Sequence, residues 1–386
     1  MSRLVAVLPD PHMALCIAAA RPGTAIATCG DESTAALLAE LTPRSVVLPA
    51  PEDLTSVALL QSPEVAALVR EEPTDLLMFK PRTRLEVAAE ALGAKLLLPG
   101  SGLSGRIENK LNLTEIAGAA GVAIPRQQRV KIAGPFADLL PDWPRPLVLQ
   151  SPRGFSGKRT FCVATDADWA ELNAELGGRP AKASEYIDGI PATVNAVVDA
   201  GGRTVCTSAI VQVTGLPTFT PFPLGSCGND FTWRVGPDPS EALAADADAI
   251  GRVLAERGYR GHFGLDFVVG ERTVLIEINA RLTASFALFA AWGPTLLDAH
   301  ITATHGGRID AGLLPPIRGG QLLAYNLTDA PGAPLPGPAQ NPLTGTTWTV
   351  PVPPPTVAPG SKRGWAVFRD QAVVTPAGDL AVSWRP

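Results

Sequence analysis

One stretch near residue 270 constrains the fold of this chain more than any other. Two apolar runs, LDFVV at 265–269 and TVLIEIN at 273–279, flank a short Gly-Glu-Arg turn and predict a β-hairpin. Alternate residues of a strand share one face, so Glu277 and Asn279 are expected to point the same way. The hairpin brings Asp266, near the start of the first strand, beside them.

These polar residues interrupt strands that are otherwise apolar enough to be buried. Buried charges need partners, and three converging oxygen-bearing side chains suit Mg²⁺ with phosphate oxygens as its remaining ligands. A lone acid such as Asp266 is more often exposed and unpaired. The placement of Glu277, Asn279 and Arg281 at every second position nevertheless favours a metal site over a solvent-facing hairpin. Arg281 is expected on the same face, where it can reach an anion.

Size and composition predict a soluble protein of two or three domains. The chain has 386 residues, 46% of them hydrophobic and 18% charged, which suits several buried cores. The net charge of −5, without a Lys/Arg-rich stripe, argues against a nucleic-acid partner. The five cysteines include no CxxC pair, which favours reduced thiols in a cytoplasmic protein. We find no apolar run of membrane-spanning length and no signal peptide, and therefore expect no membrane partner.

Short apolar strands alternate with helical patterns over residues 1–105. This order predicts a βαβ layer with a mostly parallel sheet, and hence an α/β N-terminal domain. The first strand is not followed by G-x-G-x-x-G, so a dinucleotide site is not expected.

Two later segments carry clear local signals. Asn109 is expected to cap a helix over 110–120, which a glycine ends. The segment RPLVLQSPRGFSGKRTFCV at 145–163 reads as a strand, a glycine-containing turn and a second strand. Gly154 and Gly157 would let backbone N–H groups approach phosphate oxygens, although ordinary hairpin tips also use Gly and Ser.

The hairpin motif resembles the metal-binding end of the ATP-grasp ligases. In this sequence it is G-x-D at 264–266 followed by E-x-N-x-R at 277–281. Further pieces come in the family's order: a lysine at the start of the 110–120 helix with a G-V-x-x-P turn after it, the glycine-containing turn, and EYID at 185–188. The last resembles the strand whose main chain pairs with adenine. The resemblance covers roughly residues 1–310.

The resemblance implies an ATP-grasp fold of the α/β (α+β) class. A pre-ATP-grasp domain would span residues 1–105, and the nucleotide- and metal-binding region residues 106–310. The proline-rich tail at 311–386 contains short strands and is expected to form a β-rich C-terminal lobe. That lobe would either close over the strand ends or hold a second copy of the chain in a homodimer. The segment at 216–233, rich in Pro, Gly and aromatic residues, is expected to be a functional loop or lid.

The resemblance also implies roles for particular residues, with ATP and Mg²⁺ as cofactors. Mg²⁺ would be held by Asp266, Glu277 and Asn279, and Arg281 would steady a carboxylate or acyl-phosphate. Lys110 would lie near the α-phosphate. The residues expected to bind the nucleotide are Lys110, Gln150, Gly154, Ser156, Gly157, Lys158, Glu185, Tyr186, Ile187 and Asp188.

Two positions depart from the family pattern. Gln150 stands where the common pattern has a phosphate-binding lysine, and Lys158 and Arg153 are the candidates to replace it. Pro191 stands where many members have a glutamate that holds the ribose hydroxyls, and Asp188 is the candidate there. Both departures weaken the contacts expected for ATP.

The family implies an ATP-dependent carboxylate–amine ligase acting on small molecules. A substrate carboxylate, expected from an amino acid, would become an acyl-phosphate, and an amine would displace phosphate to form an amide. The resemblance is strongest to the tyramine–glutamate ligase type of methanofuran-pathway enzymes. It rests on two segments, EYIDGIPATV and, later in the chain, IEINARLTASF. Two alternatives stay open. One is a biotin-type carboxylase that activates bicarbonate, disfavoured because no biotin-attachment motif is present; the other is a non-catalytic nucleotide-binding module.

Overall fold

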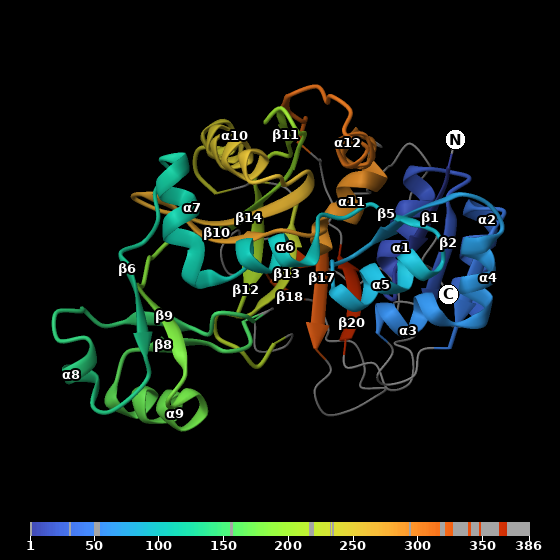
Figure 1. The fold of residues 1–386 in the computed structure, drawn as a ribbon. Coiled ribbons are helices and arrows are strands. Elements are labelled where there is room, and N and C mark those ends of the chain that lie inside the picture. The colour runs from blue at the N-terminus through green and yellow to red at the C-terminus, as the bar shows by residue number, and fades with distance from the viewer. Residues whose placement is uncertain are drawn as a thin grey trace.

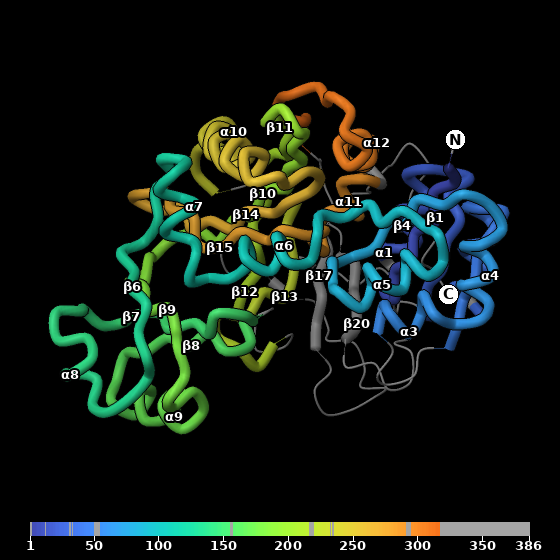
Figure 2. The backbone as a smooth tube through the Cα atoms, viewed as in Figure 1, coloured from blue at the N-terminus to red at the C-terminus, as the bar shows by residue number. Residues whose placement is uncertain are grey.

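The structure of the chain is a computed structural model. It describes residues 2–30, 32–49, 55–154, 157–215, 220–231, 233, 235–292 and 295–316, and the backbone of four short strands between positions 321 and 368. Three main sheets follow one another across the molecule (Figures 1 and 2): a parallel sheet from the N-terminus, a large sheet in the middle, and a small antiparallel sheet at the far side. This arrangement confirms the predicted mixture of α/β and antiparallel parts.

The N-terminal sheet is parallel throughout, with the strand order β3-β2-β1-β4-β5. Parallel neighbours need a crossover connection, usually a helix, and the predicted alternation of strands and helices supplies one. Both faces are covered, because Val5 and Val7 enter one hydrophobic core and Ala6 enters another. Its elements are β1 (Arg3–Val7), α1 (Pro11–Ala20), β2 (Ala25–Cys29), α2 (Glu32–Leu41), β3 (Ser45–Leu48), α3 (Ser56–Gln61), α4 (Pro63–Arg70), β4 (Thr74–Met78), α5 (Thr83–Ala91) and β5 (Lys95–Leu96).

The small antiparallel sheet has the order β6-β9-β7-β8. Side chains alternate along its strands, so one parity, including Leu149 and Ala183, packs with Trp169 in a core under two helices. The other parity is left for the opposite face. The elements are β6 (Gln127–Lys131), α8 (Phe136–Leu139), β7 (Leu147–Gln150), β8 (Thr160–Val163), α9 (Asp166–Leu176) and β9 (Pro180–Glu185).

The large sheet has the order β15-β14-β10-β12-β13-β17-β20, with β11 and β16 paired at its side. Helices α7 and α10 pack on one of its faces, while α11 and α12 pack with α1 and so join it to the N-terminal sheet. Its strands are β10 (Ile190–Val198), β11 (Thr204–Cys206), β12 (Ile210–Thr214), β13 (Ser226–Asp230), β14 (Gly261–Val269), β15 (Thr273–Asn279), β16 (Gly312–Leu313), β17 (Gln321–Asn326) and β20 (Arg363–Phe368). The helices and the remaining strand pair are α6 (Ser101–Ile107), α7 (Leu113–Ala120), α10 (Ser240–Glu256), α11 (Ala284–Trp292), α12 (Thr295–Thr304), β18 (Ala339–Gln340) and β19 (Thr347–Trp348).

The predicted hairpin is the pair β14–β15. Asp266 lies opposite Glu277, and Gly264 lies opposite Asn279, as expected from the alternation. A bulge follows Asp266, and such bulges re-aim side chains near functional sites. The first strand is longer than the sequence predicts and begins at Gly261.

Two predicted elements differ in the structure. The helix over 110–120 is divided into a 3₁₀ turn (Lys110–Asn112) and α7, because the Asn109 side chain accepts a hydrogen bond from Leu111 N and closes a tighter turn. The segment 216–233 is not irregular throughout, since Ser226–Asp230 forms strand β13. Backbone hydrogen bonds to β12 on one side and β17 on the other stabilise this polar strand. Residues 216–219 and 232 lie outside the described residues.

The C-terminal strands β17 and β20 continue the large sheet through pairing with β13. This pairing agrees with the predicted β-rich tail, of which residues 369–386 lie outside the described part of the chain. The closing and dimerising roles of the tail stay predictions. None of the helices in the described part of the chain is long and apolar enough to cross a membrane.

Candidate functional site

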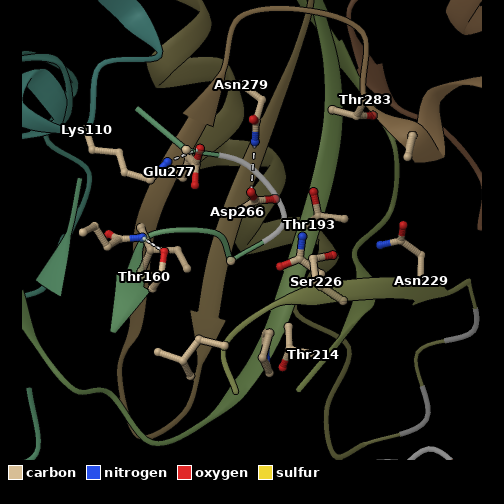
Figure 3. Close-up of a pocket in the computed structure, with 18 of the residues that line it drawn as sticks. Lys110, Thr160, Thr193, Thr214, Ser226, Asn229, Asp266, Glu277, Asn279 and Thr283 are labelled. Carbon is tan, nitrogen blue, oxygen red and sulfur yellow. Dashed lines mark hydrogen bonds and ion pairs between the residues drawn. The ribbon is translucent and has the colours of Figure 1, made fainter. Parts of the chain in front are cut away.

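A cavity of about 800 Å³ lies where the three sheets meet, within the size range typical of small-molecule sites. Its lining comes from the β14–β15 hairpin, from the free face of the small antiparallel sheet, and from loops at the carboxyl ends of β1 and β4. Figure 3 shows part of this lining, with Asp266, Glu277 and Asn279 near one another.

The hairpin brings together the three predicted metal ligands. Asn279 Nδ2 donates a hydrogen bond of 2.9 Å to Asp266 Oδ2, and Glu277 lies directly across the ladder from Asp266. Burial, and secondly the neighbouring charge of Glu277, raise the pKa of Asp266. A divalent cation at this position would stabilise the charged forms of both carboxylates, because each carboxylate otherwise disfavours the charge of the other.

Two buried lysines balance these carboxylates. Lys110 Nζ lies 2.6 Å from Glu277 Oε1, and its side chain is 5% exposed. Lys182, on β9, is 3% exposed and donates a hydrogen bond of 3.2 Å to the carbonyl oxygen of Ile276. Burial, and secondly the charge of Lys110, lower the pKa of Lys182 to about 7, against the opposing effect of Glu277. Sequence reasoning missed Lys182, although a lysine at an inward position of a small-residue strand (PAKASE) was a visible signal.

Arg281 lines the cavity but not in the predicted way. Strand β15 ends at Asn279, so Arg281 lies just beyond it and not on a continuing strand, and its role toward an anion stays a prediction. Its Nη2 donates to Asn279 Oδ1 and its Nη1 to Leu282 O, both at 2.9 Å, while Nε lies 3.2 Å from Glu108 Oε1. The guanidinium therefore fixes the orientation of Asn279 and of Glu108.

The end of β9 supplies the predicted adenine-binding segment. Glu185, Tyr186, Ile187 and Asp188 all line the cavity, as does Pro191. Tyr186 is 40% exposed at this edge, while the Glu185 carboxylate accepts a hydrogen bond of 2.6 Å from the backbone of position 126. This acid therefore fixes the strand end.

The glycine-containing turn approaches the cavity from the small sheet. Gly154 and Gly157 line the cavity. Gly157 has a φ of +75° and packs closely against Gly225. A Cβ atom at position 157 would lie only 2.3 Å from the Cα of Gly225. Lys158 is exposed and is absent from the described lining of the cavity. Gln150 does line it, and its Nε2 lies 3.4 Å from Thr160 Oγ1. Ser156 lies outside the described residues.

The end of the cavity beside the N-terminal sheet is basic. Lys80 and Arg82 follow β4 there and line the cavity together with Arg281. Glu108 pairs with both Lys80 and Arg281, so one carboxylate is shared by two cations. Burial is the main cause of a lowered Lys80 pKa, which Glu108 opposes and the two arginines reinforce. Even with Asp10 also in the lining, this end carries a net positive charge.

The comparisons with known proteins agree with this architecture. A family model described as an ATP-grasp domain matches residues 107–285. Biotin carboxylase from Campylobacter jejuni has a similar structure (TM-score 0.63, 15% identity, 96% of this chain and 87% of that chain covered). So have phosphoribosylamine–glycine ligase from Thermotoga maritima (0.61, 15%, 95% and 91%) and N5-carboxyaminoimidazole synthetase from Staphylococcus aureus (0.60, 11%, 97% and 95%).

At these identities the structural likeness shows the fold alone, whereas the family model matches the sequence of the domain itself. No curated protein matches this chain, and the narrower likeness to tyramine–glutamate ligases is not confirmed and stays a prediction. The matched residues include the hairpin, the glycine-containing turn and the buried lysines. The sequence match therefore shows that residues 107–285 of this chain form an ATP-grasp domain.

Proposed function

We propose that this protein is an ATP-dependent ligase that activates a small-molecule carboxylate as an acyl-phosphate and couples it to an amine. One observation carries the proposal: two carboxylates and the side-chain amide of Asn279 converge with two buried lysines in the cavity of an ATP-grasp domain. This is a charge pattern for binding a polyphosphate with a divalent cation. Neither an ordinary core nor an exposed surface needs it, because burying unpaired charges is costly.

The residues at the hairpin fit Mg²⁺. Asp266, Glu277 and Asn279 would hold it with carboxylate and amide oxygens, which are the ligands that this cation prefers. Among the described residues no group of three or more His, Cys, Asp or Glu side chains forms a closed metal cage. The protein's incomplete set suits a cation that keeps several other ligands, such as phosphate oxygens. When bound, Mg²⁺ supplies neutralisation of charge on the phosphates.

The other residues would position the two reacting groups. The nucleotide would lie along the free face of the small sheet, with its base at the segment from Glu185 to Asp188 and its phosphates toward Lys110. The basic end at Lys80, Arg82 and Arg281 would take the substrate carboxylate. Alignment of a carboxylate oxygen with the γ-phosphorus is the main task, since positioning and electrostatics carry the rate of phosphoryl transfer.

The proposed reaction has two steps. A carboxylate oxygen attacks the γ-phosphorus, the bond from that phosphorus to the bridging oxygen breaks, and ADP leaves. The amine nitrogen then attacks the carbonyl carbon, loses a proton, and phosphate departs with the oxygen that came from the carboxylate. Exclusion of water from the cavity protects the acyl-phosphate between the steps.

Phosphate release tests this function. Wild-type protein with MgATP is incubated with pools of amino acids and amines, with bicarbonate, or with neither, and hydroxylamine is added to trap acyl-phosphates as hydroxamates. We expect release that depends on the amino-acid pool, together with hydroxamate. Release with bicarbonate alone would favour the carboxylase alternative, and nucleotide binding without any release would favour a non-catalytic module. Asp266→Ala should abolish release, whereas Glu175→Gln, on the exposed surface of α9, should not change it.

A further inference from the structure

The small antiparallel sheet forms the cavity wall opposite the hairpin. This wall carries a buried lysine, Lys182 on β9, which lies outside the glycine-containing turn. ATP brings about four negative charges, of which Mg²⁺ would offset two, so protein cations are needed along the phosphates. On β7 the cavity-facing residue is Gln150, which has no charge. We propose that Lys182 on the neighbouring strand β9 binds the phosphate chain of the nucleotide in place of a cation at position 150; this inference rests on the proposed nucleotide-binding function.

Strand pairing places Lys182 where this role requires it. β7 and β9 are antiparallel neighbours, and Gln150 lies directly opposite Lys182 in their ladder. Opposite residues share one face with Cβ atoms roughly 5 Å apart, and both side chains line the cavity, as do the next pair on that face, Val148 and Ser184. The long lysine stem can therefore bring its ammonium to the region that a lysine on β7 would reach.

Lys182 has no direct acid partner in the described part of the chain. Its Nζ donates a hydrogen bond of 3.2 Å to the carbonyl oxygen of Ile276, and no carboxylate lies within 4 Å of it among the described residues. Lys110 and Lys80, in the same cavity, each have an acid partner. A buried ammonium without an acid is costly, and an anionic ligand entering the cavity removes that cost.

Charge balance on binding points the same way. Without ligand, the Glu277 carboxylate is paired with Lys110 and also acts on Lys182. When a divalent cation takes up the hairpin carboxylates, both lysines lose part of this compensation and become free to pair with phosphates. Lys110, in the 3₁₀ turn before α7, and Lys182, on β9, then act on the phosphate chain from two different elements.

The alternative cations are poorly placed. Lys158 and Arg153, at the glycine-containing turn, are both exposed, and neither belongs to the described lining of the cavity. In contrast to them, Lys182 is at the middle of β9, which is paired on both sides by β6 and β7. A residue so fixed is pre-organised for an anion, since little side-chain freedom is left to lose on binding.

The test compares nucleotide affinities with adenosine affinity. Dissociation constants of ADP, AMP and adenosine are measured with Mg²⁺ by calorimetry for wild type, Lys182→Gln, and the relocated pair Gln150→Lys/Lys182→Gln. Lys131→Gln, an exposed lysine on β6, is the matched control. We expect Lys182→Gln to weaken ADP about 10- to 100-fold, the range for loss of one charge-assisted hydrogen bond. Adenosine affinity should stay within about twofold, and the relocated pair should recover most of the ADP affinity.

Several results would overturn the proposal. Unchanged ADP affinity in Lys182→Gln would do so. An equal loss of affinity for adenosine would indicate a structural role of Lys182 and would also overturn the proposal. A larger loss of ADP affinity in Lys158→Gln than in Lys182→Gln would do the same. Lys182→Met keeps the buried stem and serves the same comparison should the glutamine variant fold poorly. If wild type binds no nucleotide, the proposed function itself fails. If wild type binds ADP and Lys182→Gln binds it equally well, the inference about Lys182 alone fails.

Discussion

Replacing Glu277 with glutamine should destabilise the protein even without nucleotide or metal. The Glu277 carboxylate lies 2.6 Å from Lys110 Nζ, and the charge of Glu277 also favours the charged form of Lys182. Glu277→Gln keeps the size of the side chain but leaves two buried ammonium groups with Asp266 as the remaining hairpin carboxylate. Burial of an ammonium without compensation is unfavourable.

The magnitude follows from the burial of the pair. Removing one partner of a fully buried ion pair costs about 3–5 kcal/mol. The Lys110 side chain is 5% exposed but that of Glu277 is 23% exposed, so partial solvation places the cost at the lower end, about 3 kcal/mol. If the Glu277 carboxylate served only to bind the metal, its replacement would not lower the stability of the metal-free protein. The difference is large against a total stability of about 5–15 kcal/mol.

A double-mutant cycle measures this effect. Urea unfolding at pH 7.5 with a chelator present is followed for wild type, Glu277→Gln, Lys110→Met and the double variant. We expect the double variant to be clearly more stable than the sum of the single losses predicts, with a coupling energy of about 2 kcal/mol, because it buries no unpaired charge. The reasoning would be refuted if the losses of unfolding free energy in the two single variants summed to the loss in the double variant within 0.5 kcal/mol, roughly the error of such cycles. It would also be refuted if Glu277→Gln were as stable as wild type.

Three further predictions concern other parts of the molecule. Asp266→Asn should abolish Mg²⁺-dependent phosphate release yet raise the melting temperature of the apo protein, because it removes a buried charge that Glu277 repels; loss of both activity and stability would contradict this. Burial lowers the pKa of His300 to about 4, below its unfolded value, so the unfolded state binds more protons and stability should fall by up to about 1.4 kcal/mol per pH unit as pH decreases from 6.5 to 4. Denaturation between these pH values should show a shallower slope for His300→Gln, and an unchanged slope would exclude His300 as the cause. Gly157→Ala should lower ADP affinity several-fold, because its Cβ would lie 2.3 Å from Gly225 Cα at a φ of +75°; calorimetry showing wild-type affinity would indicate that the turn does not contact the phosphates.

Local periodicity was enough to predict the β14–β15 hairpin. Its strands are consecutive in sequence, so a short turn and the alternation of side chains fix which residues meet. Asp266, Glu277 and Asn279 were therefore brought together as predicted. The bulge beside Asp266 was not predictable, because it depends on how the hairpin packs in the sheet.

The residues that the sequence did not reveal depend on distant parts of the chain. The position of Lys182 opposite Gln150 depends on the pairing of β7 with β9, and these two strands are separated in the sequence by a strand and a helix. The position of Arg281 depends on where β15 ends and on Glu108, far away in sequence. Similarly, Ser226–Asp230 is a strand because β12 and β17 pair with it, although its composition is that of a loop. Tertiary partners override local preference in each case.

The central claim is that a carboxylate attacks the γ-phosphorus of ATP in this cavity. Transfer of isotope tests it most directly: the protein is given MgATP, an amine pool and amino acids labelled with ¹⁸O in their carboxyl groups, in ordinary water, and the released phosphate is analysed by mass spectrometry. An acyl-phosphate route predicts that each phosphate carries one ¹⁸O atom from the carboxylate. Phosphate released without label would mean that water, and not a carboxylate, attacks ATP, and would contradict the account.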